Sequence, residues 1–293
     1  MCGNREASIS GLDKNNVFVG TALVNLYAKC GALRTAQELF DKLHVRNEVS
    51  WTALLAGYAE YGFFKEAFSC FEQMQGEGIH PNAITFSSIL KACANSRNLE
   101  KGQELHNLVL RDHLLADHIE VGNALVDMYA KCGAMQKAQE VFDELPTRDV
   151  VSWNALITGY TQNGHGEEAL SCFEQIQEVG FSPNAVTCIC ILKACGSIRA
   201  SDRGEAIHAL ITREQLLKTC SKVANALVDM YVKCGALEKA KDVLNQVPVH
   251  NVNCGLLLLQ DTLNMDMAQK PFTVLSKCNQ RVSLQMHSPL LAF

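Results

Sequence analysis

The sequence has no long hydrophobic run and no excess of positive charge. A membrane helix needs about 18 consecutive apolar residues, whereas the longest candidate here, GLLLL at 255–259, is far shorter. We therefore expect no membrane partner. The formal net charge of −5 argues against a protein that binds phosphates nonspecifically. It does not argue against a protein that reads single bases through contacts spread over many repeats.

Enzyme signatures are also missing. There is no GxSxG, P-loop or dinucleotide-binding fingerprint, so we expect neither catalysis nor a cofactor. The letters HGE at 165–167 match the HxE element of zinc deaminases, but no PCxxC follows them. They lie in a predicted turn between two helices, and the residues 102 positions earlier read FFK.

Paired cysteine motifs are absent as well. No CxxC occurs, and the single CxC, Cys188 with Cys190, has no partner pair nearby, so we expect no structural zinc. Most of the thirteen cysteines instead fall into three sets that recur at a fixed spacing: Cys30, Cys132 and Cys234; Cys70 and Cys172; Cys93 and Cys195. This spacing predicts small buried hydrophobic residues in a reducing compartment rather than disulfides.

What the sequence does contain is a long repeat. The stretch NALVDMYAKCG at 123–133 returns as NALVDMYVKCG at 225–235 and appears earlier as TALVNLYAKCG at 21–31. The three copies start 102 residues apart, with no insertion or deletion between them. A unit copied whole at a fixed period is typical of a repeat array.

Each 102-residue unit contains several pairs of amphipathic helices. In one pair, apolar residues at i, i+3, i+4 and i+7 predict a first helix that ends at Gly133, and a second stripe predicts a helix closed by Pro146. These stripes are Leu125, Met128, Tyr129 and Cys132, then Met135, Ala138, Phe142 and Leu145. A single pair cannot bury its stripe, so the pairs must stack. The predicted fold is all-α, an α-solenoid superhelix of helix-turn-helix repeats.

The lengths of the pairs alternate. Segments 119–149, 150–184 and 185–220 have 31, 35 and 36 residues. With VGNALVDMYAKCG, VFDELPTRDVVSWNALITGY and ALSCFEQIQEVGFSPNAVT, they closely resemble the short, standard and long motifs of the plant pentatricopeptide repeat family. The resemblance divides the array at 17–251 into seven motifs: 17–47, 48–82, 83–118, 119–149, 150–184, 185–220 and 221–251.

The resemblance implies sequence-specific binding of single-stranded organellar RNA, one base per motif, in RNA processing or C-to-U editing as the recognition module. The fifth and the last residue of each motif would read the base, because an amide or hydroxyl in a groove can hydrogen-bond to a base edge. The family also implies a mitochondrial or chloroplast location. Editing cofactors, or a deaminase supplied in trans, are further partners that it implies.

Carried over by position, the family's code assigns bases to five motifs. Thr21 with Asn47 and Thr52 with Asn82 resemble adenine readers, Asn123 with Asp149 resembles the uracil reader, and Asn154 with Asn184 and Asn225 with Asn251 resemble pyrimidine readers. The long motifs present Ser87 with His118 and Ile189 with Cys220, which depart from the readable pairs and receive no base. The expected RNA is A-A-x-U-Y-x-Y from 5′ to 3′.

Two other interpretations stay open for these residues. Asn and Thr near a helix start are also ordinary caps, and a solenoid can serve as a protein-binding scaffold instead of an RNA reader. Trp51 and Trp153 lie at helical spacing, which favours core packing over base stacking.

The two ends of the chain raise a further alternative, a non-functional gene fragment. Residues 1–16 resemble only the end of a long motif, and the deaminase-like domain of many relatives is not seen. At 252–293 the repeat vanishes, although the period calls for tryptophan at Gly255. If one thymine is restored after a TGT codon for Cys254, the shifted reading frame can encode a standard motif. In that frame the codons allow only glycine at the positions that correspond to Gly164 and Gly166. We expect an out-of-frame repeat there, which the nucleotide sequence can check.

Overall fold

The structure, a computed structural model, describes residues 17–246. The predicted remnant at 1–16, Asn251 and the proposed out-of-frame tail at 252–293 lie outside these residues. Every regular element between 17 and 246 is a helix, which confirms the predicted all-α class. None of the helices in this range has the length and apolar character needed to cross a membrane.

The helices come in pairs. The first helices are α2 (Val17–Lys29), α4 (Glu48–Glu60), α6 (Ala83–Ser96), α9 (Ile119–Lys131), α11 (Val150–Gln162), α13 (Ala185–Ile198) and α16 (Ser221–Lys233). The second helices are α3 (Leu33–Asp41), α5 (Phe64–Gly76), α7 (Leu99–Arg111), α10 (Met135–Glu144), α12 (Gly166–Glu178), α14 (Ser201–Arg213) and α17 (Leu237–Gln246). Each first helix begins at the first residue of one of the proposed motifs.

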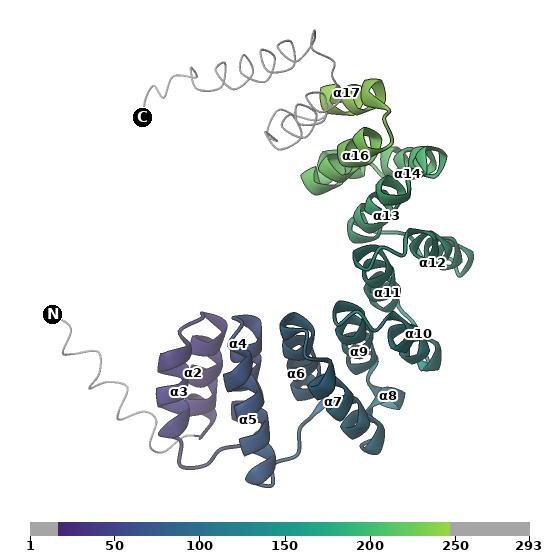
Figure 1. The fold of residues 1–293 in the computed structure, drawn as a ribbon. Coiled ribbons are helices and arrows are strands. Elements are labelled where there is room, and N and C mark those ends of the chain that lie inside the picture. The colour runs from purple at the N-terminus through teal and green to yellow at the C-terminus, as the bar shows by residue number, and fades with distance from the viewer. Residues whose placement is uncertain (1–16, 247–293) are drawn as a thin grey trace, which may run out of the picture. The chain divides into compact units, whose positions relative to one another are not determined.

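The described residues form two compact units, and the division falls inside α11, between Gly159 and Tyr160. In the first unit, α2, α4, α6 and α9 pack side by side in that order, and each packs against the second helix of its own pair (Figure 1). In the second unit, α13 packs against α12, α14 and α16, and α17 packs against α16. This stacking of helix pairs is the α-solenoid arrangement.

Local chemistry explains where the helices end. Gly133 has a φ of 80°, the left-handed conformation that glycine adopts without steric cost. Its amide donates to the carbonyl of Ala130 at 3.1 Å, and the amide of Ala134 donates to the carbonyl of Tyr129 at 2.9 Å. These two bonds are the Schellman ending of a helix, so the predicted glycine cap after α9 is confirmed.

Aromatic and small residues fill the space between the helices. Trp51 is 1% exposed and Trp153 is 5% exposed, which confirms their predicted core role. Each packs edge-on against a phenylalanine of the preceding pair, Phe40 or Phe142, with ring centroids 4.6 and 4.7 Å apart. Gly57 lets α4 approach α2 closely, because a Cβ at this position would lie 2.8 Å from the Cβ of Ala28.

The prediction of burial is right for the sets at Cys70 and Cys93 and wrong for the set at Cys30. Four members of the first two of these sets are buried: Cys70, Cys172, Cys93 and Cys195. Cys30, in contrast, is exposed, and Cys132 and Cys234 are partly exposed. Cys132 and Cys234 are the C-cap residues of α9 and α16, directly before the left-handed glycine, so the helix end carries them toward the surface.

The two long motifs contain an additional short helix that the apolar pattern does not predict. Helices α8 (Leu114–Asp117) and α15 (Leu216–Thr219) follow α7 and α14 after a residue in the left-handed conformation, His113 or Gln215. As a result, His118 and Cys220 end one helix and begin the next. These are the last residues of the long motifs, where the readable pairs also fail.

Candidate RNA-binding surface

The last residue of a short or standard motif caps the first helix of the next motif. In each case the side-chain Oδ1 accepts a hydrogen bond from the backbone amide three residues later, at distances of 2.8 to 3.1 Å. The four residues are Asn47, Asn82, Asp149 and Asn184. Capping, the alternative role for these side chains, is therefore present at this position. It also orients each side chain, since Oδ1 points to the helix and the other terminal atom is directed elsewhere.

The residue that receives the cap carries a hydroxyl group that sequence reasoning missed. Its positions are Ser50, Thr85, Ser152 and Thr187, all 0% exposed. The signal is an [ND]xx[ST] pattern across the motif junctions: NEVS, NAIT, DVVS and NAVT. The long motifs lack it, because His118 and Cys220 are followed three residues later by Val121 and Val223, and neither residue makes a side-chain cap.

The fifth residues lie within or close to the core. Thr21, Thr52 and Asn123 are 7%, 8% and 9% exposed, and Asn154 and Asn225 are partly exposed. A base that meets these side chains would have to approach the narrow space between adjacent first helices. Asn154 belongs to the first unit and Asn184 to the second, so each is placed within its own unit only.

Two of the predicted pairs are brought together. Asn123 donates from Nδ2 to Oδ1 of Asp149 at 3.3 Å. Thr52 is linked to Asn82 through Thr85. Oγ1 of Thr52 lies 2.7 Å from Oγ1 of Thr85, and the Thr85 hydroxyl donates to Oδ1 of Asn82 at 2.9 Å. The side chains that the resemblance pairs along the sequence are thus linked in space at these two junctions, directly in the first case and through Thr85 in the second.

Asp149 is held in its charged form. Burial acts to raise the pKa of this carboxyl, but hydrogen bonds from Ser152 and Asn123 outweigh burial, so the pKa lies below its ordinary value. The carboxylate is therefore ionised at neutral pH and can only accept hydrogen bonds. The hydrogen bonds from the amide and hydroxyl of Ser152 and from Nδ2 of Asn123 all reach Oδ1.

Three fifth residues contain a buried polar atom with no hydrogen-bond partner in the described part of the chain. These atoms are Oγ1 of Thr21, Oγ of Ser87 and Oδ1 of Asn123. Leaving such a group unsatisfied costs about 1–3 kcal/mol, and most buried polar groups in proteins avoid it. Nε1 of Trp51 and of Trp153 is also buried without a partner among the described residues, although both are core residues, so an unpaired atom does not by itself mark a base-reading position.

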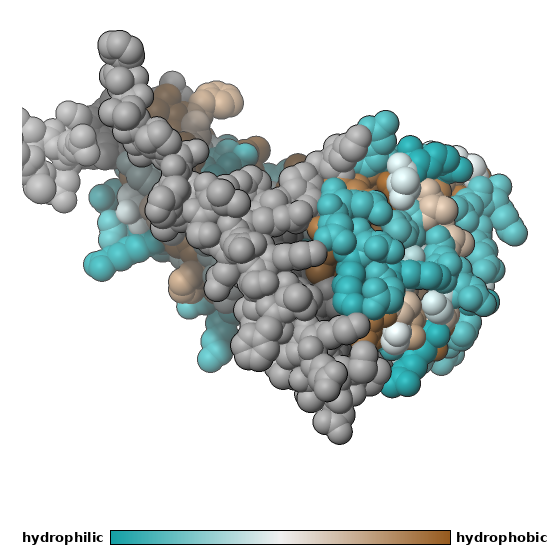
Figure 2. All heavy atoms as spheres, turned by 90° about the horizontal axis from the view of Figure 1, so that it is seen from above, coloured by the Kyte–Doolittle hydropathy of each residue, from teal (hydrophilic) through white to brown (hydrophobic). Residues whose placement is uncertain are grey.

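Exposed apolar side chains occupy the second position of five motifs. They are 53% to 84% exposed and lie on the first helix, three residues before the fifth residue, which places both on one helix face. The five are Phe18, Val49, Ile84, Val151 and Val186. On the face drawn in Figure 2, hydrophobic residues appear only as small separate patches among hydrophilic ones. The second residues of motifs 119–149 and 221–251 are instead charged, Glu120 and Lys222.

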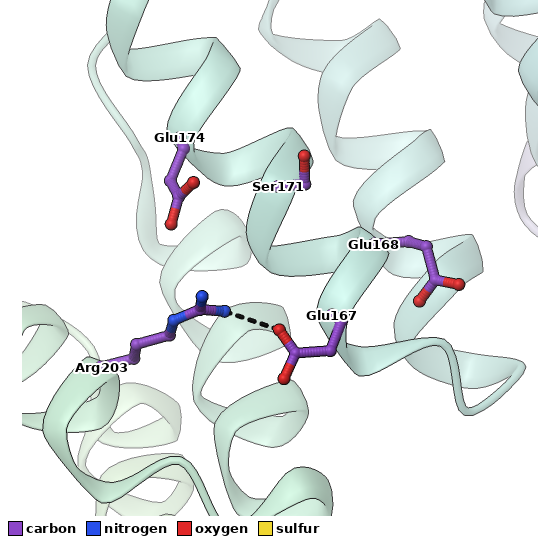
Figure 3. Close-up of a pocket in the computed structure, with 5 residues that line it drawn as sticks. All are labelled: Glu167, Glu168, Ser171, Glu174 and Arg203. Atoms are coloured by element: carbon purple, nitrogen blue, oxygen red, sulfur yellow. Dashed lines mark hydrogen bonds and ion pairs between the residues drawn. The ribbon is translucent and has the colours of Figure 1, made fainter.

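A surface hollow of about 340 Å³ between α12 and α14 contains none of the predicted base-reading residues (Figure 3). Four of its five lining residues are Glu167, Glu168, Ser171 and Glu174, and the fifth, Arg203, forms an ion pair with Glu167 at 2.8 Å. The predicted turn at 165–167 is wrong in part, because His165 is the N-cap of α12 while Gly166 and Glu167 are its first residues. Glu167 is a paired surface carboxylate. Within residues 17–246 no group of three or more potential metal ligands comes together.

Comparison with known proteins identifies the repeat. A sequence profile described as "PPR repeat family" matches residues 46–95 and 148–197, and one described as "PPR repeat" matches 21–47, 84–114, 123–150 and 223–252. The chain belongs to the pentatricopeptide repeat family. No catalytic domain is evident in the described part of this pentatricopeptide repeat chain.

Curated relatives of this pentatricopeptide repeat chain are longer plant proteins. A chloroplastic pentatricopeptide repeat-containing protein of Arabidopsis thaliana is 37% identical over 239 residues, which are 82% of this chain and 38% of that protein. A mitochondrial one from the same plant is 34% identical over 238 residues, which are 81% of this chain and 23% of that protein. The chain thus spans well under half the length of these relatives.

A solved structure supports the fold. The pentatricopeptide repeat protein PPR10, crystallised in complex with an 18-nt psaJ RNA element, matches with a TM-score of 0.76 and 20% identity. The match covers 94% of this chain and 41% of PPR10. At this identity the likeness establishes the α-solenoid fold of this pentatricopeptide repeat protein and nothing finer.

Proposed function

We propose that this pentatricopeptide repeat array binds single-stranded RNA in a sequence-specific way, with one base per motif. The fifth and last residues would contact the pairing edge of the base, and the exposed second residue would pack against its face. The observation that carries the proposal is the recurrence of these three features at the same motif positions. An organellar transcript is the proposed target, since relatives are described as chloroplastic or mitochondrial.

The pair Asn123 and Asp149 illustrates the proposed reading chemistry. Nδ2 of Asn123 donates one hydrogen to Asp149 and keeps a second, while the ionised carboxylate of Asp149 can only accept hydrogen bonds. One donor beside one acceptor matches uracil, whose N3–H donates and whose neighbouring carbonyl oxygens accept.

The base faces need a different kind of contact. A base stacked between apolar side chains loses water from both faces, which favours binding whatever its identity. Val49 and Ile84 are the second residues of α4 and α6. These consecutive first helices pack against each other. A base held between two such side chains would lie beside the fifth residue of the earlier motif. Stacking would therefore contribute affinity for any base, and the polar pair would determine which base is preferred.

The sequence of motifs yields the expected ligand, A-A-x-U-Y-x-Y from 5′ to 3′, where Y is a pyrimidine. For this array of short, standard and long motifs, we propose a role as the recognition module of C-to-U editing. The deaminase would be supplied in trans. The chain would then select the site and contribute no chemistry itself.

An electrophoretic shift assay tests the proposal directly. The purified chain is titrated against an RNA that contains A-A-x-U-Y-x-Y and against a scrambled RNA of the same composition. We expect at least about tenfold tighter binding to the first, because single mismatches in base-reading proteins cost about 1–3 kcal/mol each. Equal affinity for both would contradict sequence-specific reading and would favour a protein-binding scaffold.

A further inference from the structure

Thr85 lies between the two base-reading residues of the preceding motif. It belongs to α6, the first helix of motif 83–118, whereas Thr52 and Asn82 belong to motif 48–82. Its hydroxyl is 2.7 Å from the hydroxyl of Thr52 and 2.9 Å from Oδ1 of Asn82. Thr85 itself is 0% exposed, so it cannot touch a base.

Counting hydrogens determines the direction of both bonds. The backbone amide of Thr85 donates to Oδ1 of Asn82 at 2.8 Å, so this atom is the amide oxygen and can only accept. The hydroxyl of Thr85 has one hydrogen, which is therefore used on Asn82. In the contact between the two hydroxyls, Thr85 must accept and Thr52 must donate.

This direction determines what the pair presents to a base. The hydroxyl of Thr52 already donates its one hydrogen to Thr85, so it can only accept a hydrogen bond from a base. Asn82 has its oxygen committed to Thr85, and its Nδ2, which donates one hydrogen to Glu48, retains the other. An acceptor beside a donor matches adenine, whose N6 amino group donates and whose N1 accepts. Guanine offers the opposite arrangement, with O6 accepting and N1–H donating.

We propose that Thr85 is a positioning residue that selects adenine over guanine for motif 48–82 by fixing the hydrogen-bond polarity of Thr52 and Asn82. The inference rests on the proposed RNA-reading function. Base choice by one motif is then determined in part by the third residue of the next motif.

Motif 17–47 provides a natural contrast. Its reading pair, Thr21 with Asn47, has the same residue types as Thr52 with Asn82 but a different arrangement of hydrogen bonds. The hydroxyl of Ser50 donates to the backbone carbonyl of Asn47 at 2.8 Å rather than to its side chain. Oγ1 of Thr21 has no partner among the described residues. No neighbour among the described residues therefore fixes the direction of the Thr21 hydroxyl, and motif 17–47 should discriminate less than motif 48–82.

The test measures affinity for four RNAs that carry A or G at the first or second position of A-A-x-U-Y-x-Y. In the unmodified chain we expect a larger preference for adenine at the second position, by about fivefold, the order of one hydrogen bond. Thr85→Val should reduce that preference mainly by strengthening binding of guanine, since Thr52 regains a hydrogen to donate. A merely structural role would weaken both RNAs together.

Two further variants serve as controls. Thr85→Ser retains the hydroxyl and should retain the preference. Ser88→Ala removes a hydroxyl from the same helix that bonds only to the carbonyl of Ile84, and it should change nothing. An unchanged ratio in Thr85→Val would overturn the inference and leave RNA reading intact. If that variant does not fold, equal preferences at the two positions of the unmodified chain would overturn it. If the unmodified chain shows no preference at any position, the proposed function fails and the inference fails with it.

Discussion

Asn123 and Asp149 are 26 residues apart in the sequence and joined by a hydrogen bond of 3.3 Å from Nδ2 to Oδ1. The bond links the fifth residue of one motif to the cap of the next first helix. Asp149 also accepts from the amide and the hydroxyl of Ser152, so a proposed base-reading group is attached to the start of a helix. In this proposal, one side chain would both cap the helix and read the base.

Exchanging this pair should change the base and not the fold. Asn123→Thr combined with Asp149→Asn should move the preference of motif 119–149 from uracil toward adenine, since the pair then resembles Thr52 with Asn82. The melting temperature should change little, because Asn caps a helix about as well as Asp. Binding to RNAs that differ only at this base measures the shift. Asp143→Asn, an exposed change on α10, is the control that should leave base choice as it was, and a double variant that still prefers uracil would contradict the assignment.

Capping and reading can be separated with two asparagines. Asn82→Ala removes a cap that is also a proposed base reader, while Asn98→Ala removes the cap of α7, which accepts from the amide of Lys101 at 3.1 Å and is not a reading position. Both should lower the free energy of unfolding by about 1 kcal/mol. Only Asn82→Ala should also reduce base preference. Thermal unfolding and RNA competition measure the two effects, and parallel changes in both variants would show that Asn82 acts through stability alone.

The second residues should contribute affinity without choice. Val151→Ala removes two methyl groups from a side chain that we expect to pack on a base, so affinity should fall by about threefold to fivefold for matched and mismatched RNAs alike. Val179→Ala is the matched control, because Val179 is 61% exposed and Val151 is 58% exposed, but Val179 follows α12 and is not a second residue. Equal losses from the two changes would argue against stacking at Val151.

Two half-buried histidines should make stability depend on pH. Nδ1 of His106 and of His208 lies 2.9 Å from the hydroxyl of Tyr129 and Tyr231, and burial lowers the pKa of each ring below 6.5. As the pH falls through 6.5, the unfolded chain takes up protons that the folded chain does not, so the free energy of unfolding falls. Denaturant titrations between pH 7.5 and about 5 measure this loss.

The histidine prediction has its own controls. His106→Gln and His208→Gln replace a titrating ring with a neutral amide, and each should make stability less dependent on pH in that range. His80→Gln, at an exposed position, should leave the dependence close to that of the unmodified chain. A pH dependence that survives the changes at both half-buried positions would place its source elsewhere.

Much of the fold was predictable because it depends on local periodicity. Apolar residues at i, i+3, i+4 and i+7 define one face of a helix wherever the chain lies, and Gly133 ends α9 through its own left-handed backbone. The burial of Trp153 followed from the same spacing. The cysteine prediction failed at Cys30, Cys132 and Cys234 because periodicity describes the interior of a helix, and Cys132 and Cys234 are the C-cap residues that follow it.

The repeat, the helix pairs, their stacking and the residue types at the proposed reading positions all follow from patterns along the amino-acid sequence. Which of those residues meet depends on how the helices pack against one another. The contact of Thr52 with Thr85 spans 33 residues, and that of Asn123 with Asp149 spans 26. Both exist because one first helix packs beside the next, which places the cap of one helix against the face of its neighbour. The direction of each hydrogen bond then depends on all the partners in that space. Residues of the same type at the same motif position, such as Thr21 and Thr52, therefore differ in the hydrogen bonds that they can form.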